Sequence, residues 1–308
     1  MRRSSAIDLS GIDYRYLYNK RQTRFISRKL LNYYCSRRAV SSLIAFHSNN
    51  ARLCVDADTG CRVICNVRSI KFSADQDVAG RYRDIIAGAD SVVTNSENTA
   101  RLLVENEIAP ADKITVIHNA VPLPESEFSD RKGVILYAGS IKGIKDPMTF
   151  VRACEYLIGR KGRKVIVIMA GDGPMKGQVE DYIEKNELSE YFRLTGEIPP
   201  DELPYAEASV FVNTSVRESS SNSILEALSF GVPVVAADNP GNRGILSHLN
   251  SHQLVPVSDY MAMGEAIDRV LSFSEEQRRE LFEESRSFIR ENYSVTDIVD
   301  QYIRLLKK

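Results

Sequence analysis

Two carboxylates, Glu218 and Glu226, flank a polar segment late in the chain. Residues 219–223 read Ser-Ser-Ser-Asn-Ser, and the run Ile-Leu-Glu-Ala-Leu that follows predicts a helix. Ser and Asn are preferred where helices begin, so the free N–H groups of this helix should start at the polar segment. The N-terminus of a helix attracts phosphate, which makes this stretch a candidate anion site.

The positions of the two glutamates indicate which kind of molecule carries the phosphate. Glu218 comes just before the helix and Glu226 about a turn into it, so they should lie on opposite sides of a bound phosphate. Carboxylates accept hydrogen bonds from vicinal hydroxyls, so one glutamate could hold a ribose and the other a sugar. This arrangement favours a nucleotide sugar. Alternatively, Glu226 only supports its own helix and Glu218 only interacts with the helix dipole.

A second candidate loop reads Gly-Ser-Ile-Lys-Gly-Ile-Lys-Asp-Pro over residues 139–147. Gly139 and Gly143 allow close backbone approach, and Lys142 and Lys145 supply positive charge, as a diphosphate requires. The alternative is a structural turn that carries two solvated lysines.

Both loops belong to a regular series of strands and helices that begins at Gly133. Expected strands cover residues 134–139, 164–174, 192–196, 209–214 and 232–238, and helical patterns separate several of them. Strands that are apolar on both faces and joined by helices predict a doubly wound parallel sheet.

The first part of the chain predicts a second, smaller α/β domain. Its expected strands are 42–47, 62–67, 91–96 and 113–121, with helices at 78–88 and 97–107. The Pro-containing segment 121–130 is typical of a linker, so we expect domains at 1–128 and 129–308, with the last helix as a candidate to pack back on the first. Ligands of such domains bind at the carboxyl ends of the strands.

The bulk composition excludes several classes of protein. A chain of 308 residues is long enough for two domains, and its 43% hydrophobic and 26% charged residues are ordinary for a globular protein. It contains neither a long apolar run nor a secretory signal, which predicts a cytosolic protein. The odd number of cysteines favours buried thiols, with a metal shared by Cys61 and Cys65 as the alternative.

Residues 1–40 are strongly basic and rich in aromatic side chains. Such a segment is typical of a protein that lies on an anionic membrane surface. The alternative is an outer helix whose apolar stripe, Phe25, Ile26, Leu30 and Tyr34, packs on its own domain. No basic patch elsewhere extends this segment, so we do not expect nucleic acid as a partner.

The order and spacing of four stretches resemble a known family. VILYAGSIKGIKDP, VIVIMAGDGP, FRLTGEI and ASVFVNTSVRESSSNSILEALSFGVPVVAADNPGN are similar to the nucleotide-binding domain of family 4 retaining glycosyltransferases, which belong to the glycosyl transferases group 1. The resemblance covers roughly residues 85–270. It implies the GT-B fold, two Rossmann-like doubly wound domains, with the N-terminal domain shortened in this chain.

The resemblance also implies roles for the candidate residues. Glu226 would bind the ribose hydroxyls and Glu218 the donor sugar. The backbone N–H groups of Asn222 and Ser223 would meet the diphosphate, and Lys145 would neutralise it.

This chain departs from the family pattern at several of its positions. Ser140, beside Gly139, stands where the family usually has Arg, so Lys142 would have to substitute in the phosphate clamp. Glu218-Ser219-Ser220 replaces the family's Glu-Gly-Phe. For the position where many members place a catalytic His, the candidates are Arg68 and His47.

The resemblance implies metal-independent transfer with retention at the anomeric carbon, and no cofactor. The donor would be a nucleoside diphosphate sugar, with UDP favoured. The acceptor would be a glycan or lipid-linked saccharide of cell-surface polysaccharide, lipopolysaccharide or glycoconjugate biosynthesis, reached at the inner face of the membrane. The shortened first domain leaves an alternative: a non-catalytic nucleotide-binding protein, or a partner-dependent subunit of a split glycosyltransferase. A dinucleotide-dependent oxidoreductase is not expected, because no G-x-G-x-x-G follows a strand.

Overall fold

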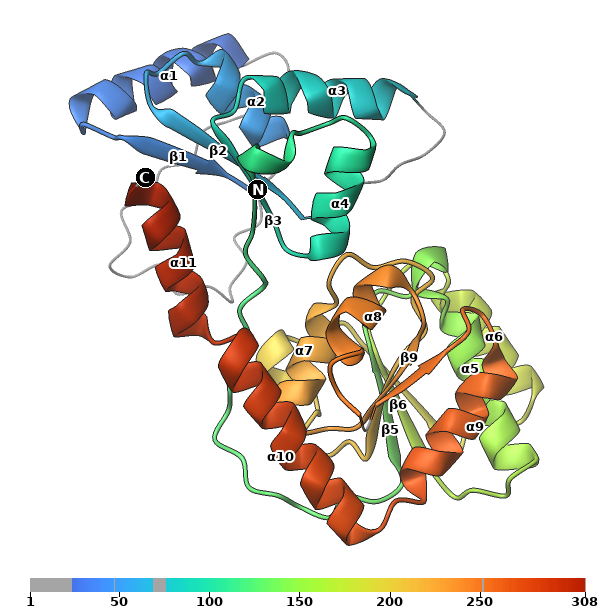
Figure 1. Cartoon of the computed structure of the whole chain (residues 1–308). Coiled ribbons are helices and arrows are strands. Elements are labelled where there is room, and N and C mark those ends of the chain that lie inside the picture. Colours follow the sequence, from blue (N-terminus) through green and yellow to red (C-terminus); the bar gives the residue numbers. More distant parts are fainter. Residues whose placement is uncertain (1–23, 47, 69–75, 251, 308) are drawn as a thin grey trace. The chain divides into compact units, whose positions relative to one another are not determined.

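The computed structural model describes residues 24–46, 48–68, 76–250 and 252–307 (Figure 1). The chain forms two compact units. Unit 1 runs to His118 and takes in the last residues, Ile303–Lys308, whereas unit 2 is Asn119–Tyr302. None of the described helices combines the length and the apolar character that a bilayer span requires.

The division between the units lies ten residues before the boundary that the sequence predicts at 128. The reason is that residues 119–130 are not a free linker. Arg286 donates from Nη2 to the carbonyl oxygen of Pro124 at 2.8 Å, and Arg278 donates from Nε to Asp130 Oδ1 at 2.7 Å. Side chains of the long helix α10 (Glu275–Asn292) thus fasten the extended segment to unit 2.

Unit 1 contains a parallel sheet of four strands in the order β1-β2-β3-β4. Its described elements are α1 (Arg24–Arg37), β1 (Ser42–Ala45), α2 (Ser48–Asp56), β2 (Arg62–Val67), α3 (Gln76–Ala87), β3 (Ser91–Thr94), α4 (Glu97–Glu105) and β4 (Ile114–Val116). Helices alternate with the strands, as a parallel sheet requires of its crossover connections. Helix α11 (Val295–Lys307) closes the chain and contributes its last residues to this unit.

Helix α1 does not pack through the apolar stripe expected from the sequence. Phe25, Ile26 and Leu30 are 66%, 59% and 42% exposed, whereas Ser27 and Cys35 are buried. The expectation that these three apolar side chains are buried against their own domain is therefore wrong. They are instead available at the surface of the described part of unit 1.

Unit 2 contains a parallel sheet of six strands in the order β10-β9-β8-β5-β6-β7 (Figure 1). Its helices and strands, besides α10 and the start of α11, are β5 (Val134–Ala138), α5 (Pro147–Gly159), β6 (Ile166–Ala170), α6 (Lys176–Lys185), β7 (Phe192–Gly196), β8 (Val210–Asn213), α7 (Asn222–Ser229), β9 (Val234–Ala237), α8 (Pro240–Leu246), β10 (Gln253–Val255) and α9 (Tyr260–Leu271). The chain builds outward from β5 to β7, returns to place β8 beside β5, and then builds outward to β10. The strand order therefore reverses between β5 and β8.

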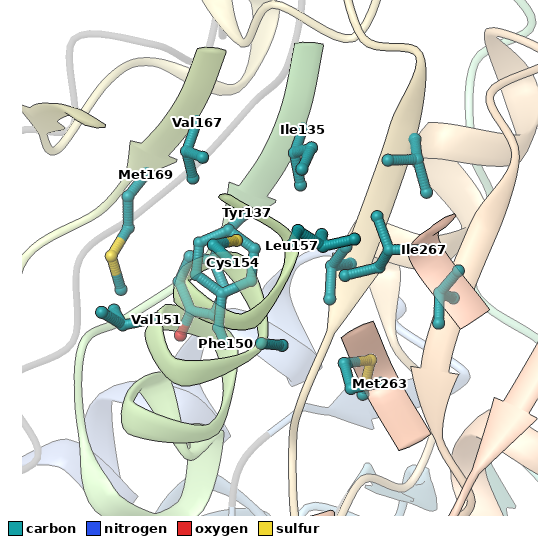
Figure 2. Packing of buried hydrophobic residues seen from close by; sticks show 14 of the residues in the cluster. Ile135, Tyr137, Phe150, Val151, Cys154, Leu157, Val167, Met169, Met263 and Ile267 are labelled. Carbon is teal, nitrogen blue, oxygen red and sulfur yellow. The ribbon is translucent and has the colours of Figure 1, made fainter. Parts of the chain in front are cut away.

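Both faces of the unit 2 sheet are buried. Successive strand residues point to opposite faces, so Ile135 and Tyr137 of β5 join one core while Leu136 joins the other. The first core is completed by α5, α6 and α9 (Figure 2), and the second by α7, α8 and α10. Each fully buried aliphatic or aromatic side chain contributes roughly 1.5–3 kcal/mol to the stability of the fold. The sheet therefore holds the loops at its edges in defined positions.

Candidate functional site

A cavity of about 520 Å³ opens in unit 2 at the carboxyl ends of the strands. Its walls are the loops that follow β5, β6 and β7, together with the loop after β8 and the first residues of α7. Connections diverge where the strand order of an open α/β sheet reverses, and this leaves a crevice. We call it the switch-point cavity.

The N-terminus of α7 lies in the wall of the switch-point cavity. The N-cap residue, Ser221, makes no side-chain hydrogen bond to the helix backbone. Its hydroxyl instead accepts from Asn213 Nδ2 and lies 3.1 Å from Ser223 Oγ. Asn222 and Ser223 line the cavity, so the first N–H groups of α7 are left for a ligand. Their partial positive charge suits an anion.

Glu218 and Lys145 form an ion pair in the cavity wall, with side chains 14% and 25% exposed. Ser215 Oγ donates a second hydrogen bond to the same carboxylate oxygen, Glu218 Oε1, at 2.9 Å. The backbone of Glu218 is also closely packed. A Cβ at Gly241 would lie 2.5 Å from the carbonyl oxygen of Glu218. The position of Glu218 is thus fixed by its surroundings.

Backbone contacts hold Lys145 beside the loop that carries Glu218. Thr214 Oγ1 donates to the carbonyl oxygen of Lys145 at 2.8 Å, and Val216 N donates to that of Ile144 at 2.9 Å. The chain then turns through Asp146, whose φ of 45° is left-handed and whose side chain caps α5. The loops after β5 and β8, distant in sequence, therefore form one wall.

Buried asparagines hold this wall in place through hydrogen bonds to the loop after β8. Asn213 Oδ1 accepts from the backbone N–H of Ser215 at 3.1 Å and from Asn242 Nδ2 at 3.2 Å. Asn239 caps α8 through its Oδ1 and donates from Nδ2 to the carbonyl oxygen of Ser215 at 2.8 Å. Buried amides of this kind are costly unless they are paired, and once paired they set a unique loop conformation.

Glu226 has a different environment, because its partner is uncharged. Tyr205, which is 1% exposed, donates from its hydroxyl to Glu226 Oε2 at 2.8 Å, and its ring stacks on Phe230. Burial raises the pKa of Glu226, and the hydrogen bond from Tyr205 offsets part of this rise. Burial also raises the pKa of Tyr205, which keeps its hydroxyl a donor.

Glycines bring the loops after β5 and β6 into direct contact. A Cβ at Gly171 would lie 2.0 Å from the carbonyl oxygen of Gly139, and one at Gly173 would lie 2.3 Å from that of Ile141. Ile141 N donates to the carbonyl oxygen of Asp172 at 2.8 Å, which fixes the pair of loops. The loop that carries Gly139 can therefore pack closely against the loop after β6 only because residues 171 and 173 are glycines.

Most of the residues that the sequence singles out meet in this one cavity. Those that line it are Gly139, Ser140, Lys145, Glu218, Asn222, Ser223 and Glu226. Lys142 is exposed and is not among the lining residues, so its expected place in the phosphate clamp stays a prediction. Arg68 is exposed at the end of β2 in unit 1 and does not line the cavity, and His47 lies outside the described residues.

Sequence reasoning missed Tyr205 and the residues of the loop after β7, Ile198 and Leu203 among them, which complete the lining. Nothing in the spacing of Tyr205, which follows a proline in a short turn, indicates that it reaches Glu226. The one signal in the sequence is that these residues follow the predicted strand at 192–196, which places them at the carboxyl edge of the sheet.

The described residues hold no group of three or more His, Cys, Asp or Glu side chains suited to a metal ion. The alternative of a metal at Cys61 and Cys65 is not supported. Cys61 donates from Sγ to the carbonyl oxygen of Val40 at 3.0 Å. Burial raises the pKa of Cys65 to about 12, which favours the thiol form.

Comparison with known proteins bears on the same region. The model of the family described as glycosyl transferases group 1 matches residues 123–288, more than half of the chain. The chain belongs to this family. The matched residues contain every residue that lines the switch-point cavity.

Curated relatives share about a quarter of their aligned residues with this group 1 chain. D-inositol 3-phosphate glycosyltransferase of Thermobispora bispora is 28% identical over 197 residues, which is 57% of this chain and 46% of the relative. 2-deoxystreptamine N-acetyl-D-glucosaminyltransferase of Niallia circulans is 28% identical over 143 residues, which is 46% of this chain and 36% of the relative. The chain thus spans less than half the length of each of these relatives.

Solved structures extend the similarity over nearly the whole chain. The crystal structure of Anabaena Alr3699/HepE in complex with UDP matches with a TM-score of 0.80 at 15% identity, over 94% of this chain and 84% of that one. The same Anabaena protein in complex with UDP-glucose also matches with a TM-score of 0.80. This likeness bears on the fold, and it confirms the expected class: two Rossmann-like α/β domains of the GT-B type.

Proposed function

We propose that the protein is a retaining glycosyltransferase that moves a sugar from a nucleoside diphosphate sugar, with UDP as the favoured nucleotide, to a glycan or lipid-linked saccharide. One observation carries this proposal. In a member of the glycosyl transferases group 1 family, a helix N-terminus, the Lys145–Glu218 pair and Glu226 converge on one cavity at the topological switch point. Groups that suit an anion, a sugar and a ribose therefore line the same cavity.

The chemistry of the residues that line the switch-point cavity suggests how the donor is oriented in it. The diphosphate would lie at the N-terminus of α7, against Gly139 and Ser140. Glu226 would accept hydrogen bonds from the ribose hydroxyls, since an ionised carboxylate accepts with both oxygens. The base would then extend toward Ile198 and the other residues of the loop after β7. The sugar would lie at the opposite end, near Glu218.

The leaving group in this reaction is a nucleoside diphosphate that gains negative charge as the bond to the sugar breaks. Lys145 and the N–H groups at the start of α7 supply positive charge where that charge develops. In this structure Lys145 pairs with Glu218. On donor binding, Lys145 would turn to the diphosphate, and Glu218 would exchange it for hydroxyls of the sugar. These groups support transfer without a metal or a cofactor.

UDP is favoured because Anabaena Alr3699/HepE, which matches over 94% of the chain, was solved with UDP and with UDP-glucose. The curated relatives include an N-acetyl-D-glucosaminyltransferase, which supports a hexose or N-acetylhexosamine as the transferred sugar. Since the chain covers less than half of these relatives, the donor is best identified by experiment.

The described part of the N-terminal segment supports peripheral attachment to an anionic membrane, where a lipid-linked acceptor would be met. Phe25, Ile26 and Leu30 are exposed on α1, and Lys29 lies 4.5 Å from the centre of the Phe25 ring. Exposed apolar and basic side chains on one helix suit the lipid headgroup region. Flotation with phosphatidylglycerol vesicles tests this: Phe25→Ser with Leu30→Ser should reduce binding, and equal flotation of the wild type and this variant would contradict it.

The donor proposal is tested by the release of nucleoside diphosphate from a panel of UDP-, GDP- and ADP-sugars. We expect slow release from one UDP-sugar that is lost in Glu226→Ala and retained in Glu207→Ala, which removes an exposed glutamate outside the cavity lining. Release without dependence on Glu226 would contradict the assignment of the site. No release from any donor, together with no nucleotide binding, would favour a non-catalytic or partner-dependent role.

A further inference from the structure

A second cavity, of about 460 Å³, lies at the amino ends of strands β5, β6 and β8 in unit 2. We call it the amino-edge cavity. Gly133, Val165 and Ser209, which immediately precede or begin these strands, form its floor. Strand β5 is five residues long, which separates the two edges of the sheet by about 16 Å. The amino-edge cavity is therefore distinct from the switch-point cavity and shares no lining residue with it.

The lining of the amino-edge cavity is strongly cationic. Its charged side chains are Arg131, Lys132, Arg163, Lys164 and Arg278. Two carboxylates pair with members of this set. Asp130 Oδ2 lies 3.0 Å from Lys132 Nζ and its Oδ1 lies 2.7 Å from Arg278, whereas Asp268 Oδ1 lies 2.5 Å from Arg163 Nε. Five cations against two carboxylates leave three positive charges.

Two of the five cations have no carboxylate partner among the described residues. Lys164 is exposed, with its ammonium free to meet a ligand. Arg131 is only half-exposed, and its guanidinium group donates from Nη1 to the carbonyl oxygen of Phe230 at 3.3 Å. Its Nε is buried without any partner. A buried donor that is left unpaired is unfavourable, and more so when it is charged.

Arg131 is partly buried and lies near a second positive charge, that of Arg286. Burial lowers the pKa of Arg131, and the neighbouring charge of Arg286 lowers it further. Arg286 itself is occupied with the carbonyl oxygens of Ser229 and Pro124, so it adds charge but no free donors. An anion bound beside Arg131 would offset the repulsion between the two guanidinium groups.

We propose that the amino-edge cavity binds a phosphate-bearing ligand. Arg163 and Arg278 are held by Asp268 and Asp130 and contribute positive charge, whereas Arg131 has no carboxylate partner among the described residues, and its planar guanidinium group suits phosphate oxygens. Lys132 and Lys164 lie on the open side and attract the ligand from solution. The proposal uses no residue of the donor site and therefore stands apart from the function proposed above.

The test compares two double variants that remove the same net charge. Lys132→Ala with Lys164→Ala removes two lysines of the amino-edge cavity, and Lys185→Ala with Arg290→Ala removes two exposed cations that do not line it. Calorimetric titration with inorganic pyrophosphate, in the presence of saturating UDP, should give an affinity about tenfold weaker in the first variant than in the wild type. The second variant should bind like the wild type.

A parallel arm identifies the source of the phosphate. If it is a lipid headgroup, the Lys132/Lys164 variant should float less than the Lys185/Arg290 variant with phosphatidylglycerol vesicles. If it is a free phosphate compound, the two variants should float equally while their pyrophosphate affinities differ. The proposal is overturned if the two variants agree in both measurements. Arg131→Gln should repeat the first result, because it removes the guanidinium group whose Nε has no partner.

Discussion

Two glutamates line the switch-point cavity, and in our proposal they lie at the two ends of the donor, yet their side chains are held in opposite ways. Glu218 lies in a loop and is paired with the cation Lys145. Glu226 lies in α7 and accepts from the uncharged, buried hydroxyl of Tyr205. The same residue type can therefore serve two purposes according to its partner. We expect the charged end to determine turnover and the uncharged end to determine donor binding.

The largest effect should come from the charged end. Glu218→Gln keeps the size of the side chain but removes the charge that meets Lys145 and, in our account, the donor sugar. We expect kcat to fall by about 100-fold or more, the size of loss seen when a group that stabilises a transition state is removed. UDP affinity should be unchanged or higher, because Lys145 is freed for the diphosphate.

Steady-state kinetics and UDP calorimetry measure the two quantities separately. Glu207→Gln, in an exposed turn outside the cavity lining, is the matched control. A Glu218→Gln enzyme that turns over normally but no longer binds UDP would reverse the roles of the two ends.

The uncharged end should show the opposite pattern. Glu226→Gln leaves an acceptor for the Tyr205 hydroxyl, so folding should be preserved, but it replaces charge-assisted hydrogen bonds to the ribose with neutral ones. We expect UDP affinity to fall by roughly 10-fold to 100-fold, as for the loss of about 1.5–3 kcal/mol. At saturating donor, kcat should stay within about threefold of the wild type. Unchanged affinity with a lower kcat would contradict the comparison.

A smaller effect should follow from the buried support of the charged end. Asn239→Ala removes the cap of α8 and the hydrogen bond to the carbonyl oxygen of Ser215. We expect the free energy of unfolding to fall by about 1–2 kcal/mol and kcat to fall about tenfold, because the loop that carries Glu218 loses its position. Denaturant unfolding and kinetics would measure both. A matching loss of UDP affinity would show that Asn239 supports both ends alike.

The smallest effect is a pH dependence of donor binding. Burial raises the pKa of Glu226 above its ordinary value of 4.5, and the carboxylate accepts ribose hydroxyls only when it is ionised. UDP affinity should therefore be full at neutral pH and decline, as the pH falls, through a range higher than 4.5. The hydrogen bond from Tyr205 lowers this pKa, so Tyr205→Phe should move the decline to still higher pH.

Calorimetry across pH, with Glu226→Gln as the reference, separates this titration from that of the UDP phosphate. The wild type and Glu226→Gln should differ most at neutral pH and converge as Glu226 becomes protonated. A constant difference at every pH would place the titrating group elsewhere.

Much of unit 2 could be predicted from the sequence, because its strands are apolar on both faces and its helices begin with recognisable caps. The predicted strand at 192–196 agrees with β7 at both ends. Helix α8 was missed because its Asn-Pro-Gly start reads as a turn. Strand β10 was missed because three residues are too few to show a period.

The site was predictable where it depends on helix starts and strand ends, and not where loops from different parts of the chain meet. Glu218 and Glu226 follow from the polar segment before α7. The place of Lys142 outside the cavity lining could not be predicted, because the loop after β5 takes its shape from contacts with Gly171 and Val216, which its own sequence does not contain. Tyr205 could not be found, because its contact with Glu226 arises from tertiary packing alone.

The central claim, that the switch-point cavity holds the donor, is tested most directly by amide hydrogen exchange with and without UDP. We predict slower exchange on UDP binding in the loops after β5, β6 and β7 and at the start of α7, and unchanged exchange at the amino-edge cavity. Protection that is absent from the start of α7, or that is confined to unit 1, would contradict the account.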